Sequence, residues 1–327
     1  MSGYFIVGGA GFIGSHLARR LLSHTEDSIT IYDNFSSGRL WRLGDAIHSP
    51  RLKIIRDDVK DLAALATAMR GHTGVFHFAS NPDIARAVTE PDIDFREGTA
   101  LTQNVLEAMR QTGVGHLTYA SGSGVYGDTG ERPVHEDRAP LLPISTYGAS
   151  KLAGEALICA YGQMFGIHGM AFRFANVVGP RQSHGVCYDF ILRLLNDPTQ
   201  LRILGDGRQS KSYIHVDDVL DAMLLIASQN HGGFEYFNVA TEDYLTVKEI
   251  ADLVVARLGL SGVKYQFTGG DRGWKGDVPI VRFDTQKLRK RGWQNRRTSA
   301  QALADSIDSM IADAKAGRLN QPMDMQP

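Results

Sequence analysis

Short apolar runs alternate with amphipathic segments through the first half of the chain. The runs that predict buried strands span residues 4–7, 28–32, 51–56, 75–78, 116–120 and 169–174. Between them, apolar residues at helical spacing predict helices over residues 12–23, 61–70, 92–111 and 146–165. Strands that alternate with helices build a parallel sheet with helices on both faces. The pattern therefore predicts an α/β fold around a doubly wound parallel sheet.

The pattern changes after residue 175. Gly179 and Pro180 interrupt the chain, and shorter segments rich in polar residues and glycine follow. We expect residues 1–175 to form one domain around the sheet, with a return segment near residues 212–240. Residues 176–327 should form mainly a smaller α/β substrate-binding domain. The polar stretch over residues 315–327 predicts a frayed tail.

Composition and charge narrow the classes of function. The 327 residues are 43% hydrophobic and 22% charged, which is typical of a globular protein, and the formal net charge is -1. That charge provides no basic field for nucleic acid or a membrane surface. No apolar run reaches the roughly 18 residues of a membrane-spanning helix, and the N-terminus has no secretory signal pattern. We expect a soluble, cytoplasmic protein with no nucleic-acid or membrane partner.

The residue types that hold metals or form disulfides have no informative spacing. Cys159 and Cys187 lack the CxxC pattern, and the histidines are scattered without metal-ligand spacing. The sequence therefore predicts no metal. It predicts two buried free thiols, as suits a reducing cytoplasm.

Residues 8–14, with the sequence GGAGFIG, join the first predicted strand to the first predicted helix. Glycines at this spacing allow a tight turn and let the backbone approach a pyrophosphate at the positive end of the helix. Asp33 ends the second strand, about 20 residues on, where a carboxylate holds the ribose hydroxyls of NAD and repels the 2′-phosphate of NADP. Arg39 is the contrary signal, because a nearby Arg can accommodate that phosphate. Asp58 is a candidate for the adenine edge, with an exposed loop acid as the alternative.

Tyr147 and Lys151 lie four residues apart, on one face of a predicted helix. A phenol, with an ordinary pKa of about 10, is a poor base at neutral pH unless a neighbouring positive charge stabilises its anion. The Lys151 ammonium and the positive nicotinamide ring would supply that charge. Tyr147 can then take a proton from a sugar hydroxyl while hydride leaves the same carbon. The glycine turn and this pair together predict a Rossmann-type NAD-binding domain.

With these motifs in place, the chain resembles the extended short-chain dehydrogenase/reductases, the NAD-dependent epimerase/dehydratase family. The resemblance covers about residues 4–293. Its most specific segments are residues 8–14, 123–127 (SGVYG), the Tyr147–Lys151 pair, 173–180 (RFANVVGP), 205–209 (GDGRQ) and 213–218 (YIHVDD). Within the family it is similar to UDP-glucose 4-epimerase-like enzymes. Residues 271–278 (DRGWKGDV) contribute to this similarity.

The resemblance implies a cycle with tightly held NAD. A ring carbon of the sugar is oxidised to a ketone, the keto-sugar turns over, and hydride returns to the other face with no net redox change. The residues expected to bind NAD are Gly8, Gly11, Phe12, Ile13, Gly14, Asp33, Asn34, Ser37, Gly38, Asp58, Val59, Phe78, Ala79, Ser80, Ser121, Tyr147 and Lys151.

Two positions depart from the family's pattern. Gly122 stands where the family usually has a Ser or Thr, four residues before the Tyr of its VYG segment. The hydroxyl that shares a hydrogen bond with the substrate must then come from Ser121, from Ser123 or from water. We expect Ser123, which joins Tyr147 and Lys151 as a catalytic residue. Gly98 replaces an Asn that faces the cofactor site, so the two glycines together predict a roomier pocket.

The next two positions after Gly122 bear on the reaction. In 4,6-dehydratases they hold an Asp and a Glu that eliminate water from the sugar. Here they are Ser123 and Gly124, which argues against dehydration.

The resemblance also implies contacts to the substrate. Asn176 matches a position that contacts the pyrophosphate of a nucleotide sugar, and Lys211 stands where 4-epimerases commonly carry an Arg toward it. Arg272 and Asp277 resemble a late Arg and Asp that reach phosphate and ribose, with Lys275 as the alternative to Arg272. The expected substrate-binding residues are Ser123, Tyr147, Asn176, Lys211, Arg272 and Asp277.

These inferences lead to one principal hypothesis and two alternatives. The principal hypothesis is NAD-dependent epimerisation of a nucleotide-diphosphate sugar, at carbon 4, through a transient keto-sugar. The alternatives are a nucleotide-sugar dehydratase or reductase, and a non-catalytic NAD-binding sensor. The family also implies a homodimer paired through the helices over residues 92–111 and 146–165. Ala153, Leu157, Leu101 and Val105 are the residues expected on that surface.

Overall fold

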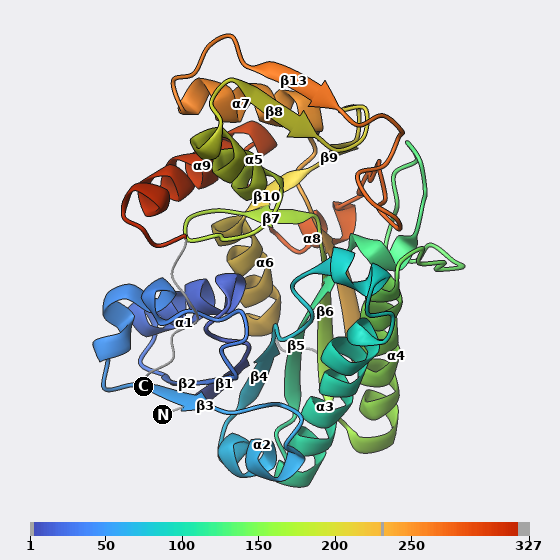
Figure 1. The fold of residues 1–327 in the computed structure, drawn as a ribbon. Coiled ribbons are helices and arrows are strands. Elements are labelled where there is room, and N and C mark those ends of the chain that lie inside the picture. Colours follow the sequence, from blue (N-terminus) through green and yellow to red (C-terminus); the bar gives the residue numbers. More distant parts are fainter. Residues whose placement is uncertain (1–2, 230–231, 320–327) are drawn as a thin grey trace.

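The computed structural model describes residues 3–229 and 232–319, and its centre is a seven-stranded sheet (Figure 1). The strands are β1 (Gly3–Val7), β2 (Ser28–Asp33), β3 (Leu52–Arg56), β4 (Gly74–His77), β5 (His116–Gly122), β6 (His168–Phe174) and β11 (Phe234–Val239). Their order is β11-β6-β5-β4-β1-β2-β3, and every neighbouring pair is parallel. This confirms the predicted doubly wound sheet, to which β11 adds a seventh strand.

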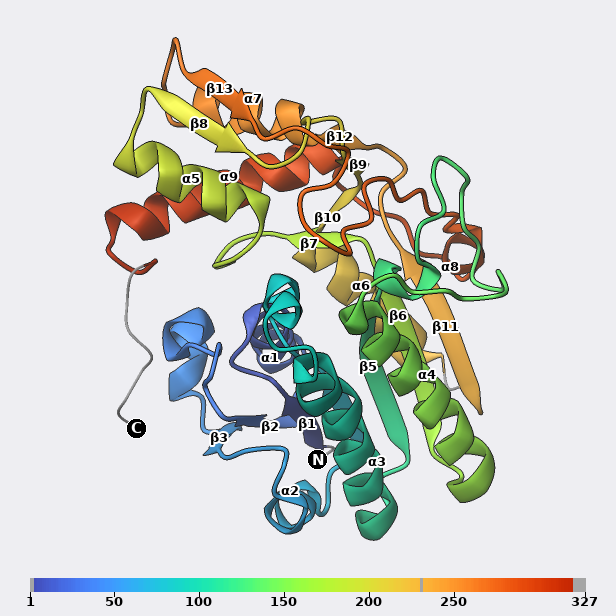
Figure 2. The same ribbon diagram turned by 45° about the vertical axis from the view of Figure 1, so that its right-hand side comes forward.

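Helices cover both faces of the sheet (Figures 1 and 2). One face carries α1 (Phe12–His24) and α6 (Val216–Ser228), and the other carries α2 (Leu62–Met69), α3 (Ala100–Thr112) and α4 (Thr146–Phe165). Side chains of β1 alternate between two hydrophobic cores: Ile6 packs in the core under α1 and α6, whereas Phe5 and Val7 pack in the core under α2 and α3. Burial on both faces explains why the strands are nearly continuous apolar runs.

A second group of elements lies above the carboxyl ends of the strands (Figure 2). Helices α5 (Val186–Asn196), α7 (Val247–Arg257) and α9 (Ser299–Lys315) share a separate core with β8 (Gln200–Ile203). The smaller elements here are β7 (Asn176–Val178), β9 (Ser210–Lys211), β10 (Tyr213–His215), β12 (Leu245–Thr246), β13 (Lys264–Phe267) and α8 (Gln286–Lys290). In parallel α/β sheets, ligands bind outside the carboxyl ends of the strands, so this group lies on the side where a substrate is expected.

Short helical turns connect the main elements: η1 (Leu40–His48), η2 (Ile84–Val88), η3 (Phe95–Thr99) and η4 (Ser123–Tyr126). The helix predicted over residues 92–111 is therefore a π-helical turn, η3, that continues into α3. The predicted tail falls partly on residues 320–327, which are outside the described residues. Across residues 3–229 and 232–319, each helix is too short or too polar to cross a membrane.

Two expectations about individual residues are wrong. Cys159 lies exposed on α4, so only Cys187 is a buried thiol, and burial raises its pKa to about 12. Leu101 and Val105, expected on a dimer surface, lie in the core under α3, because that side of the helix faces the sheet. Their exposed fractions are 5% and 0%, so they cannot contact a second subunit.

Candidate active site

The glycine turn between β1 and α1 has little room for side chains. Gly8 has a φ of 76°, and a Cβ there would lie 2.7 Å from the backbone nitrogen of Ala79, at the end of β4. A Cβ on Gly14 would lie 2.5 Å from the carbonyl oxygen of Gly8. Gly11 precedes α1 and forms no side-chain cap, so the first-turn amides of Phe12 and Ile13 keep free donors. A bare turn that ends in uncapped amides fits a pyrophosphate.

Asp33 fixes the loop beside this turn. Its Oδ2 accepts a hydrogen bond from the Ala10 amide at 2.9 Å, and its Oδ1 accepts one from the Phe35 amide at 2.8 Å. Burial raises the pKa of Asp33, while these hydrogen bonds and the Arg42 guanidinium oppose that shift. A Cβ on Gly38 would lie 2.7 Å from Oδ1, so only glycine leaves this carboxylate accessible from that side.

The other residues expected to bind NAD continue this surface. Asn34 donates from Nδ2 to Asp58 Oδ2 at 3.0 Å. Burial opposes ionisation of Asp58, but the hydrogen bonds from Asn34 and from the Lys60 amide outweigh it and lower its pKa. Ser37 is exposed, Val59 is buried, and Phe78, Ala79 and Ser80 follow β4 directly. The structure therefore places this set along one edge, at the carboxyl ends of β1, β2, β3 and β4.

Tyr147 and Lys151 lie in the first turns of α4, where Ser145 caps the helix by accepting from the Gly148 amide at 3.1 Å. The Lys151 Nζ lies 5.4 Å from the ring centroid of Tyr147 and 5.1 Å from that of Tyr119. It donates to the carbonyl oxygen of Ala120, on β5, at 2.9 Å. The predicted pair is thus held together against the sheet.

Burial changes the proton affinities of both groups. It lowers the pKa of Lys151 to about 8 and raises the pKa of Tyr147 to about 12. A hydrogen bond with Ser80 opposes the shift of Tyr147, and the charge of Asp94 adds to it. Without a further positive charge, Tyr147 stays protonated at neutral pH. Its use as a base therefore requires a cation beside it.

The three small residues at the end of β5 differ in their surroundings. Ser121 is buried, and its hydroxyl donates to Glu155 at 2.6 Å. Ser123 is half-buried, and across the described residues its hydroxyl takes no partner. At Gly122 the nearest atom to an added Cβ is the carbonyl oxygen of Phe174, at 4.0 Å. Ser123 is therefore the hydroxyl available to a ligand, and Gly122 leaves open space.

Glu155 belongs to a buried ion pair beneath these residues. Arg173, on β6, pairs with Glu155 at 2.6 Å and also donates to the hydroxyl of Tyr126 at 2.9 Å. Tyr126 in turn donates to Asn238, on β11, at 2.7 Å. A buried pair of this kind is stable only when its polar atoms are satisfied, and here the network joins α4 to three strands of the sheet.

Gly98 does not enlarge the pocket, which corrects one of our expectations. A Cβ at this buried position would lie 2.8 Å from the hydroxyl oxygen of Ser150. The glycine therefore allows η3 to pack closely against α4, and the space is filled by Ser150. Of the two glycines that suggested a roomier site, only Gly122 borders open space.

The residues expected to contact the substrate gather on the other side of the site. Lys211 pairs with Asp277 at 2.7 Å, and its Nζ lies 5.3 Å from the ring centroid of Trp274. Arg272 pairs with Asp128 at 2.6 Å and donates to the carbonyl oxygen of Asp277. Asn176 is exposed on β7, and its amide donates to the carbonyl oxygen of Ser212, the residue after Lys211, at 3.3 Å. The two cations expected to bind phosphate, Lys211 and Arg272, therefore each already pair with a carboxylate.

Gly276 connects this cluster to the Tyr147 helix. A Cβ there would lie 3.3 Å from the carbonyl oxygen of Ile144 and 3.4 Å from the side chain of Ser145, the N-cap of α4. The loop that contains Arg272 and Asp277 thus rests on the start of α4. The substrate-side cluster therefore packs against the start of the helix that carries Tyr147.

Three residues at the site were not anticipated. Asp94 is buried and accepts hydrogen bonds from Asn81 and Thr146, which flank Ser80 and Tyr147 in sequence. Asp94 falls inside the helix predicted over residues 92–111, and the sequence pattern gave it no role there. The available signal was that Thr146 and Asn81 each adjoin a residue already assigned to the site.

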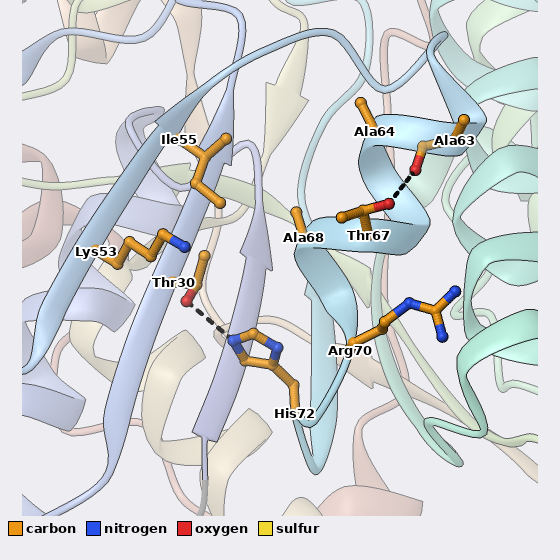
Figure 3. A pocket seen from close by; sticks show the side chains of 9 residues that line it. All are labelled: Thr30, Lys53, Ile55, Ala63, Ala64, Thr67, Ala68, Arg70 and His72. Carbon is orange, nitrogen blue, oxygen red and sulfur yellow. Dashed lines mark hydrogen bonds between the residues drawn. The ribbon is translucent and has the colours of Figure 1, made fainter.

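An open hollow lies away from this site, between α2 and the strands β2 and β3 (Figure 3). Alanines of α2 line one wall, Lys53 lies on the opposite wall, and His72 hydrogen-bonds to Thr30 at 2.9 Å. It contains none of the residues expected to bind cofactor or substrate. Within residues 3–229 and 232–319, no group of three or more His, Cys, Asp or Glu side chains is arranged to hold a metal ion.

Comparisons with known proteins agree with this geometry. Residues 4–240 match the NAD dependent epimerase/dehydratase family. The chain is 32% identical to a UDP-glucose 4-epimerase of Mycolicibacterium smegmatis over 93% of its own length and 96% of that protein.

Solved structures give the same result. A crystal structure of a UDP-galactose 4-epimerase is 37% identical with a TM-score of 0.84, covering 95% of this chain and 99% of that one. The dTDP-glucose 4,6-dehydratase DesIV from Streptomyces venezuelae, crystallised with NAD, is 26% identical with a TM-score of 0.87, covering 96% and 98%. The chain therefore belongs to the NAD-dependent epimerase/dehydratase family, and its cofactor is NAD.

Proposed function

We propose that the chain inverts carbon 4 of a nucleotide-diphosphate sugar, with a UDP-hexose as the first candidate substrate. The relatives named above as UDP-glucose and UDP-galactose 4-epimerases support this substrate class. Dehydratases such as DesIV are relatives that favour the alternative reaction.

The observation that carries the proposal is the packing at Gly124. A Cβ there would lie 3.1 Å from the Cα of Gly148, a tight contact that requires a small shift of α4 for any side chain at this position. The preceding position, Ser123, also lacks a carboxylate. The two acids that eliminate water in 4,6-dehydratases are therefore absent, and the tight contact with α4 disfavours a side chain at position 124. What remains is the machinery that moves a proton from and to the sugar hydroxyl and a hydride from and to the carbon that carries it.

The residues of this chain divide the work. Gly8, Gly14 and the first turn of α1 hold the pyrophosphate of NAD, which accepts and returns the hydride when bound. Tyr147 takes the proton of the sugar hydroxyl at its phenolate oxygen and later gives it back. Lys151 stabilises that phenolate, because an ammonium close by favours the charged form. Ser123 donates to the reacting oxygen.

The substrate cluster holds the nucleotide end of the sugar. Arg272 and Lys211 offer the cations that a diphosphate requires, and Asn176 lies beside them. In this arrangement the diphosphate displaces Asp128 from Arg272, and Asp277 stays buried to orient Lys211. Residues 176–327, apart from the return segment near residues 212–240, serve as the substrate domain, and residues 1–175 serve as the cofactor domain. We place the enzyme in the cytoplasm.

The first prediction tests the reaction and its base. Purified protein, incubated without added cofactor with a panel of UDP-, dTDP-, GDP- and ADP-sugars, should convert at least one sugar to its 4-epimer. Tyr147→Phe should lower turnover by about 10²–10⁴-fold, the usual loss of an acid–base group. Chromatography of the products gives both results.

Tyr161→Phe is the matched control, because Tyr161 is on the same helix and its hydroxyl accepts a hydrogen bond from Gln103, away from the site. Retention of more than half the turnover by Tyr147→Phe would refute its role. A 4-keto-6-deoxy product would identify a dehydratase instead.

The second prediction concerns cofactor choice. Asp33→Ala should weaken NAD binding and narrow the preference for NAD over NADP, because the carboxylate no longer repels the additional phosphate. Calorimetry on protein freed of bound cofactor measures both affinities, with the exposed Asp45→Ala as control. Equal affinity of the unmodified protein for NAD and NADP would show that Asp33 does not select the cofactor.

The third prediction concerns the missing hydroxyl. Ser123→Ala should lower turnover strongly, whereas Ser121→Ala should affect stability more than turnover, because Ser121 donates to Glu155. Gly122→Ser should fold normally, since its Cβ meets open space, and should keep or raise activity on a UDP-hexose. Turnover and melting temperature are measured for each variant.

Loss of all activity in Gly122→Ser, with an unchanged melting temperature, would mean that the true substrate fills this space. If none of the three variants changes turnover, Tyr147 acts directly or through water.

The fourth prediction concerns assembly as a homodimer through α4. Ala149, Ala156 and Ala160 are exposed along one side of this helix, and the Met164 side chain is 71% exposed at its end. Such a stripe of small residues allows two copies of the helix to approach closely. Light scattering at micromolar concentration should give a dimer mass, and Ala160→Arg should give a monomer. A monomeric unmodified protein would refute the dimer.

A further inference from the structure

Asp94 lies between the cofactor side of the site and the Tyr147 helix. Its side chain is 1% exposed, immediately before η3. Oδ1 accepts a hydrogen bond from Asn81 Nδ2 at 2.8 Å, and Oδ2 accepts one from Thr146 Oγ1 at 2.6 Å. Both donors are neutral, and across the described residues no Lys, Arg or His lies within ion-pairing distance of Asp94. A carboxylate buried without a cation partner is costly, so this one needs an explanation.

The two donors are sequence neighbours of two residues that contact each other. Asn81 follows Ser80, and Thr146 precedes Tyr147. The side chain of Ser80 lies close enough to Tyr147 to lower the pKa of its phenol. Asp94 therefore ties the end of β4 to the start of α4 directly beside the point where the phenol is held. A shift of either element would strain both of its hydrogen bonds.

We propose that Asp94 is a positioning residue, which fixes Tyr147 beside Ser80. Its negative charge also favours the protonated form of Lys151. The inference rests on the proposed use of Tyr147 and Lys151 as the proton-transfer pair. It assigns Asp94 no contact with substrate or cofactor.

Among the titratable groups around Tyr147 and Lys151 in the described part of the chain, Asp94 is the one whose charge acts on the pair. From β4, His77 faces Lys151, and burial lowers the pKa of His77 to about 3, so it is neutral. From β5, Tyr119 is fully buried, and burial raises its pKa. From α4 itself, Glu155 is one turn beyond Lys151, but its charge is neutralised by Arg173. The charge of Asp94 is not neutralised in this way.

The consequence for pH dependence has a definite sign. Burial sets the pKa of Lys151 at about 8 and that of Tyr147 at about 12, and in both cases the charge of Asp94 raises the value. Activity should need a deprotonated Tyr147 and a protonated Lys151. Removing the charge lowers both proton affinities, so both limbs of the pH–rate profile move to lower pH. Because the two groups interact, the limbs report the pair as a whole.

The test compares Asp94→Asn with Thr146→Val. Asp94→Asn removes the charge and should move both limbs to lower pH by about one unit, the size expected for a single charge at close range. Thr146→Val removes one hydrogen bond of Asp94 but keeps the charge, so it should lower turnover without moving either limb. If Asp94→Asn lowers the maximal rate without moving either limb of the pH–rate profile, Asp94 has only a structural role and the proposal is overturned. Asp94→Ser is the second neutral variant if Asp94→Asn does not fold.

A second measurement needs no activity. The phenol of Tyr147 is titrated by ultraviolet difference absorption in the NAD complex, with Tyr147→Phe as the blank. Its midpoint should fall in Asp94→Asn and stay in place in Thr146→Val. A midpoint that does not move overturns the inference even if the enzyme is an epimerase. A midpoint that falls in a protein inactive on every sugar supports the inference and rejects the proposed function.

Discussion

The buried ammonium of Lys151 is the constraint on which the site depends. Taking a charge out of water costs free energy unless nearby groups replace the lost solvation. Here the carbonyl oxygen of Ala120, the rings of Tyr119 and Tyr147, and the charge of Asp94 take that place. These groups come from three parts of the chain: Tyr119 and Ala120 from β5, Tyr147 from α4, and Asp94 from the residue before η3. The ammonium therefore requires β5, α4 and the segment before η3 to be placed together, and the same placement sets the position of Tyr147.

Close packing of α4 makes this placement possible. A Cβ on Gly154 would lie 2.5 Å from the hydroxyl of Tyr119, and one on Gly148 would lie 2.4 Å from the carbonyl oxygen of Gly124. Glycine at these positions lets the helix approach the sheet closely enough for Lys151 to reach Ala120. The Glu155–Arg173 pair then fixes the next turn of the helix to β6. The same packing leaves little room for a side chain at Gly124, one of the two positions at which the proposed reaction differs from dehydration.

The fold and the main motifs could be predicted because they depend on local patterns. Apolar periodicity identified the strands and helices, and glycine spacing identified the turn beside Asp33. Long-range contacts could not be read in this way. Gly98 suggested open space, but a Cβ at that position would contact Ser150. Leu101 was expected on a dimer surface, but α3 turns it toward the hydrophobic core. Asp94 was missed because Asn81 and Thr146, its donors, are far from it in sequence and meet it only in the folded chain.

The central claim is that hydride leaves and returns at one carbon while the sugar stays bound. The most direct measurement follows deuterium placed at carbon 4 of the sugar that the enzyme converts, with the product analysed by NMR. The account predicts that the 4-epimer retains the deuterium at carbon 4 in unlabelled water. Transfer of the label to carbon 6 would show dehydration. Loss of the label to added, exchangeable cofactor would show a net dehydrogenase or reductase, and either result would contradict the account.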